Sequence, residues 1–149
     1  MQMVRLIYVS RMTEACDILA IQRILDVSRR GNKSRDITGA LCYDPMFFLQ
    51  CPEGPRDAVN KLYAEIQQDV RHQDVVLLEY CDVEERVFAD WSMAFLKAQD
   101  LGKEALERYT GGGKLDPYAL SSGQARQLLV EVVKAAHDNL SRQSVVHDG

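Results

Sequence analysis

Residues 37–50 read ITGALCYDPMFFLQ and decide the fold. Two short runs rich in strand-forming residues flank the turn dipeptide Asp44-Pro45, a pattern typical of a β-hairpin. Because side chains alternate along a strand, Phe48 and Gln50 share one face of the second strand. If that face is buried, the Gln50 amide needs partners, since an unpaired buried amide costs about 1–3 kcal/mol. The search for a functional site therefore starts at Gln50.

The composition is that of an ordinary water-soluble domain. A chain of 149 residues predicts one domain, and 46% hydrophobic with 27% charged residues is typical of a globular protein. The net charge of −4 argues against a nucleic-acid partner. The sequence has neither a membrane-spanning apolar run nor a signal peptide, so we expect no membrane association and a cytoplasmic location.

The cysteines and histidines do not suggest a metal site. No Cys-x-x-Cys pair is present, so we interpret the cysteines as reduced, mostly buried thiols: Cys16, Cys42, Cys51 and Cys81. The histidines do not follow a metal-ligand spacing either; they are His72, His137 and His147.

Apolar periodicity predicts two helices and three further strands around the hairpin. We expect strands at residues 4–9, 75–81 and 88–95, and helices from Thr13 or Asp17 to Arg30 and from Pro55 to Asp69. Gly31-Asn32 is expected to end the first helix. The strand at 75–81 is apolar almost throughout, as a central strand would be. The order β-α-β-β-α-β-β predicts an α+β, ferredoxin-like sheet with both helices on one face.

The last third of the chain predicts two further helices, at residues 101–109 and from Ser121 or Ser122 to about Leu140. We therefore divide the chain into a domain at residues 1–98 and a helical extension at residues 99–149. The apolar stripe of the longer helix includes Leu128, Leu129 and Val132. That stripe is expected either to cover the open face of the sheet or to take part in self-association.

Several polar residues are expected near the helix side of the sheet: Tyr8, Ser28, Asn32, Gln50, Asp69, Arg71 and His72. Each has a plain structural explanation, such as a core tyrosine, a helix cap or a solvated loop. Together they predict a slot, since we expect neighbouring parallel strands to bring Tyr8 and Gln50 within reach of each other. Neutral hydrogen-bonding groups facing apolar helix stripes would suit a flat ligand with polar edges.

Hydrolytic chemistry is not indicated at this slot. It contains no evident pair of nucleophile and base, and the chain has no glycine-rich phosphate loop. His72 follows Arg71, which favours binding of an anion or a carbonyl group over base catalysis.

Several separate motifs of the sequence resemble the blue-light-using-flavin (BLUF) photoreceptor domains over about residues 3–98. They are Tyr8 in RLIYVS, Asn32 seven positions before Gly39, the ITGALCY and FFLQ segments, Asp69 to His72, and Trp91-Ser92-Met93. The chain length and the C-terminal helices are similar to those of the short, stand-alone members.

The resemblance implies a noncovalent flavin, usually FAD with FMN or riboflavin as alternatives, between the two helices. Gln50 would bridge Tyr8 and the N5/C4-carbonyl edge of the flavin, and Asn32 would bond its carbonyl edge. Arg71 and His72 would lie near the pyrimidine side or the ribityl chain, and Asp69 near the ribityl hydroxyls. The ring would be lined by Ile24, Ser28, Phe48 and Ile66.

The resemblance also implies how light would act. Tyr8 would supply an electron and a proton, the hydrogen bonds around Gln50 would rearrange, and Trp91 and Met93 would exchange places or adjust. The sequence alternation itself places Trp91, Met93 and Phe95 on one face of the last strand. We expect no enzymatic activity, a separate protein as effector, and a homo-oligomer assembled through the C-terminal helices.

Three positions depart from the pattern of the family. Pro52 replaces the leucine of a Leu-Glu-Gly motif, so the strand should end there or lie at an edge. Gly31 removes a polar contact, and Glu65 stands where some relatives have an arginine near the phosphate. Two alternatives stay open: an acylphosphatase-type hydrolase using Arg11 and Asn32, and a scaffold that binds flavin without photochemistry.

Overall fold

The computed structural model describes residues 2–13, 18–91, 93–111 and 113–148, so that Cys16, Asp17 and Ser92 lie outside the described residues. The described chain contains five strands, four α-helices and two short 3-10 helices. They are β1 (Met3–Met12), α1 (Ile18–Ser34), β2 (Thr38–Tyr43), β3 (Phe47–Pro55), α2 (Arg56–Gln68), β4 (His72–Val83), β5 (Ala94–Lys97), η1 (Ala98–Leu101), α3 (Lys103–Thr110), η2 (Pro117–Ala119) and α4 (Ser122–Asp148).

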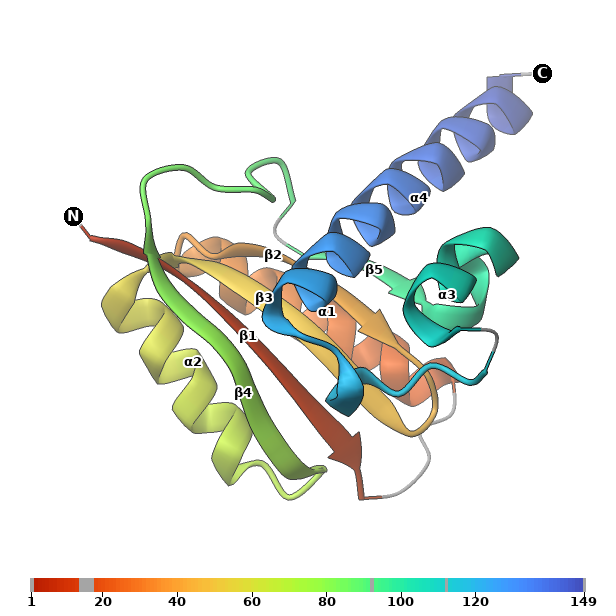
Figure 1. Ribbon diagram of the computed structural model, residues 1–149. Helices are drawn as coiled ribbons and strands as arrows, with labels where there is room; N and C mark the ends of the chain where they lie inside the picture. Colours follow the sequence, from red (N-terminus) through yellow and green to blue (C-terminus); the bar gives the residue numbers. More distant parts are fainter. Residues whose placement is uncertain (1, 14–17, 92, 112, 149) are drawn as a thin grey trace.

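The strands form one sheet in the order β4-β1-β3-β2-β5, which confirms the predicted α+β class. Helices α1 and α2 cover one face, and α4 crosses the other face (Figure 1). The first helix packs Ile21 and Leu25 against Phe48, whereas the second packs Val59 against Leu6. Both crossover helices therefore cover the same face, as predicted.

The β2–β3 hairpin forms at the predicted place. The Asp44 carboxylate accepts the backbone N–H groups of Met46 at 2.6 Å and Phe47 at 2.9 Å, which closes the turn. Gly39 packs directly against the partner strand, where a Cβ atom would lie only 2.3 Å from the Cys51 carbonyl oxygen. A larger residue at position 39 would thus push the two strands apart.

The expected direction of two neighbouring strands is wrong. Tyr8 and Gln50 do lie directly opposite each other, but β1 and β3 are antiparallel. In a split β-α-β unit each helix connects parallel strands that are not adjacent, so β1 and β3 run in opposite directions. Tyr8 and Gln50 still meet because both point to the cavity face of the sheet, whichever way the strands run.

The last two strands differ from their predictions. β4 is an edge strand and not a central one, and it leaves Val76 and Leu77 exposed. A high apolar content therefore did not indicate a place in the middle of the sheet. β5 begins only at Ala94, so Trp91 and Met93 precede it and do not alternate as strand residues.

Helix α1 passes through its predicted end at Gly31-Asn32 and continues to Ser34. The backbone turns at Asp36, which has a left-handed φ of 59°, and Ile37 N–H returns to the Asn32 carbonyl at 2.8 Å. Aspartate tolerates this conformation, and here it ends the helix in place of glycine. Pro55 is the residue before α2 and not its first helical residue.

Pro52 neither ends β3 nor lies at an edge of the sheet. β3 is a central strand that runs on to Pro55, and Pro52 pairs with Gly39 of β2. The β1–β3 register passes from Arg5–Glu53 directly to Tyr8–Gln50. Pro52 falls inside this interruption, and the strand continues on both sides of it in the same register.

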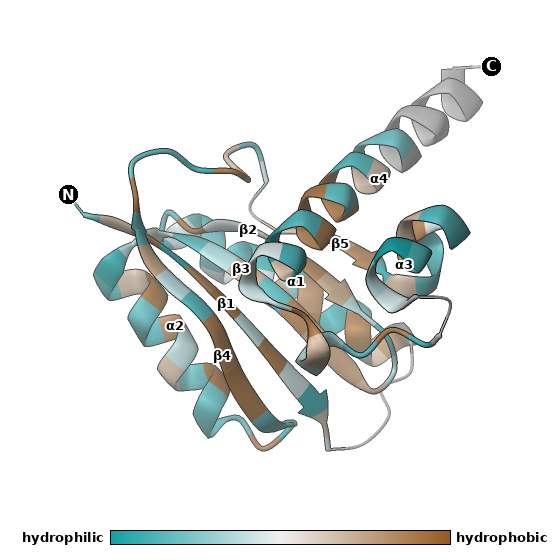
Figure 2. Ribbon diagram, viewed as in Figure 1, coloured by the Kyte–Doolittle hydropathy of each residue, from teal (hydrophilic) through white to brown (hydrophobic). Residues whose placement is uncertain are grey.

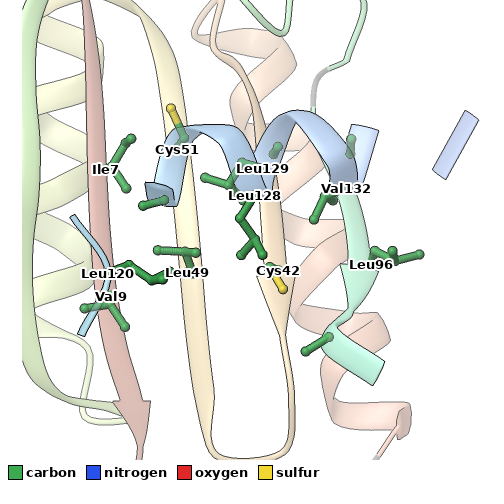
Figure 3. Packing of buried hydrophobic residues seen from close by; sticks show 14 of the residues in the cluster. Ile7, Val9, Cys42, Leu49, Cys51, Leu96, Leu120, Leu128, Leu129 and Val132 are labelled. Atoms are coloured by element: carbon green, nitrogen blue, oxygen red, sulfur yellow. The ribbon is translucent and has the colours of Figure 1, made fainter. Parts of the chain in front are cut away.

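The C-terminal extension covers the open face of the sheet. Figure 2 shows brown, apolar turns in the part of α4 that lies over the strands, and Figure 3 shows its side chains meeting those of the sheet. Leu128, Leu129 and Val132 are fully buried there. This confirms covering as the role of that stripe. The helix extends to Asp148, beyond the predicted end near Leu140, and projects away from the sheet (Figure 1).

Candidate functional site

A cavity of about 210 Å³ lies between α1, α2 and the sheet. This volume exceeds the roughly 30 Å³ share of one liquid water several-fold, so it is large enough for an organic ligand. It is lined by most of the predicted site residues, namely Tyr8, Ile24, Ser28, Asn32, Phe48, Gln50, Ile66, Asp69, Arg71, His72 and Met93. The structure therefore brings these residues together from five elements, the connection between α2 and β4, and the segment before β5.

The floor of the cavity is a pair of buried hydrogen-bonding side chains. Tyr8 and Gln50 are only 1% and 7% exposed, and the Tyr8 hydroxyl donates to Gln50 Oε1. Burial raises the pKa of Tyr8, so the phenol keeps its proton and acts as a donor. The other end of the amide donates from Nε2 to Met93 Sδ at 3.7 Å. Both ends of Gln50 are thus occupied.

Gln50 is held by a weak partner on one side. A thioether sulfur is a poor acceptor compared with a carbonyl oxygen, so the Nε2 group would gain by meeting a stronger acceptor. By rotating, the amide would turn Nε2 toward the Tyr8 hydroxyl, which can accept, and Oε1 toward Met93 Sδ, which has no proton to donate. The rotated amide would therefore bond Tyr8 with reversed polarity and lose its bond to Met93.

The walls of the cavity come from helical residues at regular spacing. Ile24, Ser28 and Asn32 follow one another at four-residue intervals along α1 and therefore share one face. Asn32 is buried, with 2% exposure. Across the cavity, Ile66 lies on α2 and Phe48 on β3. These walls are apolar, apart from the Ser28 hydroxyl and the Asn32 amide.

The rim carries charge. Arg71 pairs with Asp69 at 2.6 Å, and this hydrogen bond lowers the pKa of Asp69 to about 2. His72 Nδ1 lies 2.8 Å from the buried Ser10 hydroxyl, and its ring packs 5.5 Å from that of Phe48. Burial lowers the pKa of His72, so the imidazole is neutral at neutral pH and offers a hydrogen bond without charge.

Trp91 does not line the cavity. It packs against the hydrophobic cluster on the opposite side of the sheet, while Met93 faces Gln50. The prediction that both residues share a face is therefore wrong, since the two precede β5 and do not follow strand alternation. The Trp91 carbonyl accepts the N–H of Gly39 at 3.0 Å, which fixes this segment beside β2.

Sequence reasoning missed several residues of the cavity. Leu41 lies directly opposite Gln50 in the hairpin, and Leu62 precedes Ile66 by one helical turn. Hairpin parity and helical spacing could have identified both. Arg35 also lines the rim, where it holds Glu65 through two contacts of 3.0 Å. No local pattern predicts that pair, because Arg35 lies in the turn after α1 and Glu65 lies on α2.

Comparison with known proteins relates the chain to a family of sensor domains. The family model described as sensors of blue-light using FAD matches residues 3–94. The chain belongs to the BLUF family. BLUF domains bind a flavin, and the donors and apolar walls of this cavity fit such a ring. Residues 3–94 are therefore a blue-light sensor domain, as the resemblance implied.

Named relatives agree with this assignment. Photoactivated adenylate cyclase subunit beta of Euglena longa is 38% identical over 89 residues, which are 59% of this chain and 10% of that protein. The antirepressor BluF of Escherichia coli strain K12, described as regulated by blue light and temperature, is 35% identical over 77 residues, 52% of this chain and 19% of that protein. The chain thus spans about a tenth of the length of the cyclase relative.

A solved structure matches over most of both chains. The dark-state structure of the BLUF protein BlrB has a TM-score of 0.72 and 31% identity, covering 91% of this chain and 97% of that one. The sensory assignment leaves no support for the acylphosphatase-type alternative. Arg11 lies outside the cavity, where it faces Asp74 at 3.6 Å and stacks on Tyr118.

In the described part of the chain, no helix is both long enough and apolar enough to cross a bilayer.

Proposed function

We propose that this BLUF chain signals through the hydrogen bonds of Tyr8 and Gln50 to a separate protein, with FAD as its flavin. The observation that carries the proposal is the buried Tyr8–Gln50–Met93 chain at the floor of a cavity. FMN or riboflavin would occupy the same ring site. The finer parts of the proposal are the residue roles, the choice of FAD, a cytoplasmic location and a homo-oligomeric assembly.

Three sets of residues would hold the flavin. Ile24, Ser28, Phe48 and Ile66 would enclose the ring, and Asn32 and Gln50 would bond its polar edge. Asp69, Arg71 and His72 stand at the rim, where the side chain of the flavin would leave the cavity. When bound, the flavin supplies the absorption of blue light and a transient acceptor for an electron.

The chain's own residues supply the switch. Loss of an electron makes a phenol strongly acidic, so the Tyr8 proton would move along its hydrogen bond to Gln50 Oε1. Return of the electron and a proton to Tyr8 would then leave the amide in its alternative arrangement, with Met93 Sδ released. A buried hydrogen bond is worth about 0.5–1.5 kcal/mol net, and an unpaired group costs more. Reversal of one amide is therefore enough to bias the neighbouring segment between two positions.

Residues 1–98 are proposed as the sensor unit and residues 99–149 as an extension that carries the signal. The match of the family model to residues 3–94 supports this boundary. The projecting part of α4 is a surface for assembly with a second copy or for docking of an effector (Figure 1). Relatives with cyclase or antirepressor names suggest that the output differs between members.

An absorption spectrum before and after blue illumination tests the proposal. We expect purified protein to be yellow and to show a small, reversible red shift. Tyr8→Phe should retain flavin and abolish the shift completely, because the proton donor to Gln50 is removed. Tyr63→Phe is the matched control: its ring lies 5.8 Å from that of Tyr8, but it does not bond Gln50.

Different failures of this experiment have different meanings. Protein that takes up no flavin would contradict the assignment of the cavity. Flavin uptake without any light-induced shift would select the photochemically silent scaffold. A normal shift in the Tyr8→Phe variant would exclude Tyr8 as the donor while leaving the flavin site intact.

A further inference from the structure

Glu53 is a fully buried carboxylate on β3, three residues beyond Gln50. Its two oxygens accept the backbone N–H groups of Val87 at 3.0 Å and Phe88 at 2.8 Å. These donors belong to the long connection between β4 and β5, the green loop in Figure 1. A buried carboxylate is costly unless it is paired, so its position and that of the loop depend on each other.

The same loop delivers Met93 to the cavity. Trp91 N–H bonds the Phe88 carbonyl at 3.1 Å, and the Trp91 carbonyl accepts from Gly39 at 3.0 Å. Met93 Sδ then accepts from Gln50. The loop is thus attached to β3 twice, once through Glu53 on the α4 side of the sheet and once through Gln50 on the cavity side.

Charged side chains connect Glu53 to the C-terminal helix. Arg5 on β1 lies 3.6 Å from Glu53 and 3.2 Å from Glu79 on β4. Glu79 in turn meets Arg126 of α4 at 3.3 Å. The side chains of Arg5 and Glu79 are only 10% and 16% exposed. Water therefore screens the Arg5–Glu79 pair poorly, so these two charges respond to the loss of a neighbour, whereas the 39% exposed Arg126 side chain is partly screened.

We propose that Glu53 is a positioning residue for Met93, and that Arg5, Glu79 and Arg126 link this position to the docking of α4. Displacement of α4 removes Arg126 from Glu79, which weakens the hold of Arg5 on Glu53 and loosens the loop at Val87. By reciprocity, movement of the loop weakens the docking of α4 to the same extent. The link to light rests on the proposed function, whereas the link between α4 and the loop does not.

The other attachments of α4 do not connect it to the loop between β4 and β5. Leu128 and Leu129 hold the helix through apolar contacts, which are not directional. Arg108 bonds Glu131 and ties α4 to α3 without reaching the sheet. That pair provides a matched control, since its loss also removes one ion pair from α4.

Amide hydrogen exchange of the flavin-loaded full chain in the dark tests the structural link. Arg126→Gln is expected to accelerate exchange at Val87 and Phe88 by about tenfold, because the remaining buried charges lose a partner. Arg108→Gln should accelerate exchange in α3 and α4 only. Faster exchange in α4 with unchanged exchange at Val87 and Phe88 in the Arg126→Gln variant would overturn the proposal.

Spectroscopy tests the positioning of Met93. Glu53→Gln should change the rate of dark recovery after blue light several-fold, and Glu53→Asp, which keeps the charge, should restore part of it. If Glu53→Gln does not fold, Glu79→Gln takes its place, and it should also change the rate of dark recovery several-fold. Equal recovery rates in the folded variant and the parent protein would refute the positioning role.

The two proposals fail in distinguishable ways. Absence of any red shift in the parent protein would reject the proposed photochemistry, while the exchange data would still decide whether α4 and the loop are linked. A normal red shift, with unchanged exchange at Val87 and Phe88 in the Arg126→Gln variant, would reject only the link between α4 and the loop.

Discussion

The two faces of the sheet are built from the same strands but packed in opposite ways. On one face, here called the dry face, Ile7, Leu49 and Cys42 meet α4 in a buried apolar cluster (Figure 3). On the other face, Tyr8 and Gln50 look into the cavity beneath α1 and α2. Strand alternation alone separates these environments.

The difference shows how one thin sheet can serve stability and switching at once. The α4 face is filled by apolar side chains whose contacts have no alternative arrangement. The cavity face contains an amide with two possible arrangements and a weak sulfur partner. Leu49 therefore supports the structure, whereas Gln50, the next residue along β3, is a candidate switch. Substitutions on the two faces should consequently affect different measurements.

The largest effect on folding is expected on the dry face. Leu128→Ala removes a fully buried side chain from the cluster under α4 and should lower the free energy of unfolding by about 2–5 kcal/mol. Urea denaturation of the flavin-free protein measures this loss. Because Leu128 does not line the cavity, the position of the flavin band in folded variant protein should stay unchanged. A loss below about 0.5 kcal/mol would show that α4 contributes little to the core.

A smaller and different effect is expected on the cavity face. Ile66→Ala enlarges a space that is already open, so the unfolding free energy of the flavin-free chain should fall by about 1–2 kcal/mol or less. Flavin affinity should fall by about tenfold, since the ring loses an apolar wall. Titration of apoprotein with FAD, FMN and riboflavin measures the affinity. Equal loss of stability for Ile66→Ala and Leu128→Ala would remove the contrast between the faces.

Much of this contrast could be predicted from the sequence. The hairpin turn at Asp44 and the alternation around Phe48 identify both faces of β3, and helical spacing places Asn32 and Ile66 on the walls. These are local patterns. The pairing of Tyr8 with Gln50 also followed from parity, although the strand direction was wrong because direction depends on how the crossovers are wound.

The remaining features depend on contacts that sequence patterns do not contain. Trp91 and Met93 separate to opposite sides because β5 begins after them, and strand boundaries are poorly specified by composition. Pro52 lies in a central strand, at a point where the β1–β3 pairing is interrupted. The chain of charges from Glu53 to Arg126 joins residues far apart in the sequence, with no spacing rule to indicate it.

A weaker effect than either truncation is expected from pH, again only on the cavity face. Burial lowers the pKa of His72 below its unfolded value, with Asp69 opposing and Arg71 reinforcing the shift. The unfolded chain therefore binds a proton more readily. The stability contributed by neutral His72 is complete above pH 6.5 and is lost as the pH falls toward the lower, folded pKa.

His72→Gln should remove this part of the pH dependence while keeping a hydrogen-bonding group beside Ser10. Urea midpoints at pH 7.5 and 5.5 provide the measurement. The midpoint of the parent protein should fall more between the two conditions than that of the variant. Parallel decreases in both proteins would assign the pH dependence to groups other than His72.

The smallest effect on stability is expected at the contact that defines the switch. Met93→Leu replaces a buried side chain by one of similar volume, so the unfolding free energy should change by less than about 1.5 kcal/mol. The variant nevertheless removes the sulfur that accepts from Gln50 Nε2. We therefore expect flavin to be retained, with a displaced dark-state band and an altered recovery rate.

Met46→Leu is the matched control, since Met46 is 51% exposed and does not line the cavity. Its spectrum and recovery should equal those of the parent protein. If Met93→Leu were equally silent, the sulfur would be a packing atom and the Gln50 amide would be held by Tyr8 alone. If Met93→Leu changes the photocycle at nearly constant stability, a substitution on the cavity face can alter the signal without altering the folding energy. Substitutions on the dry face cannot do this.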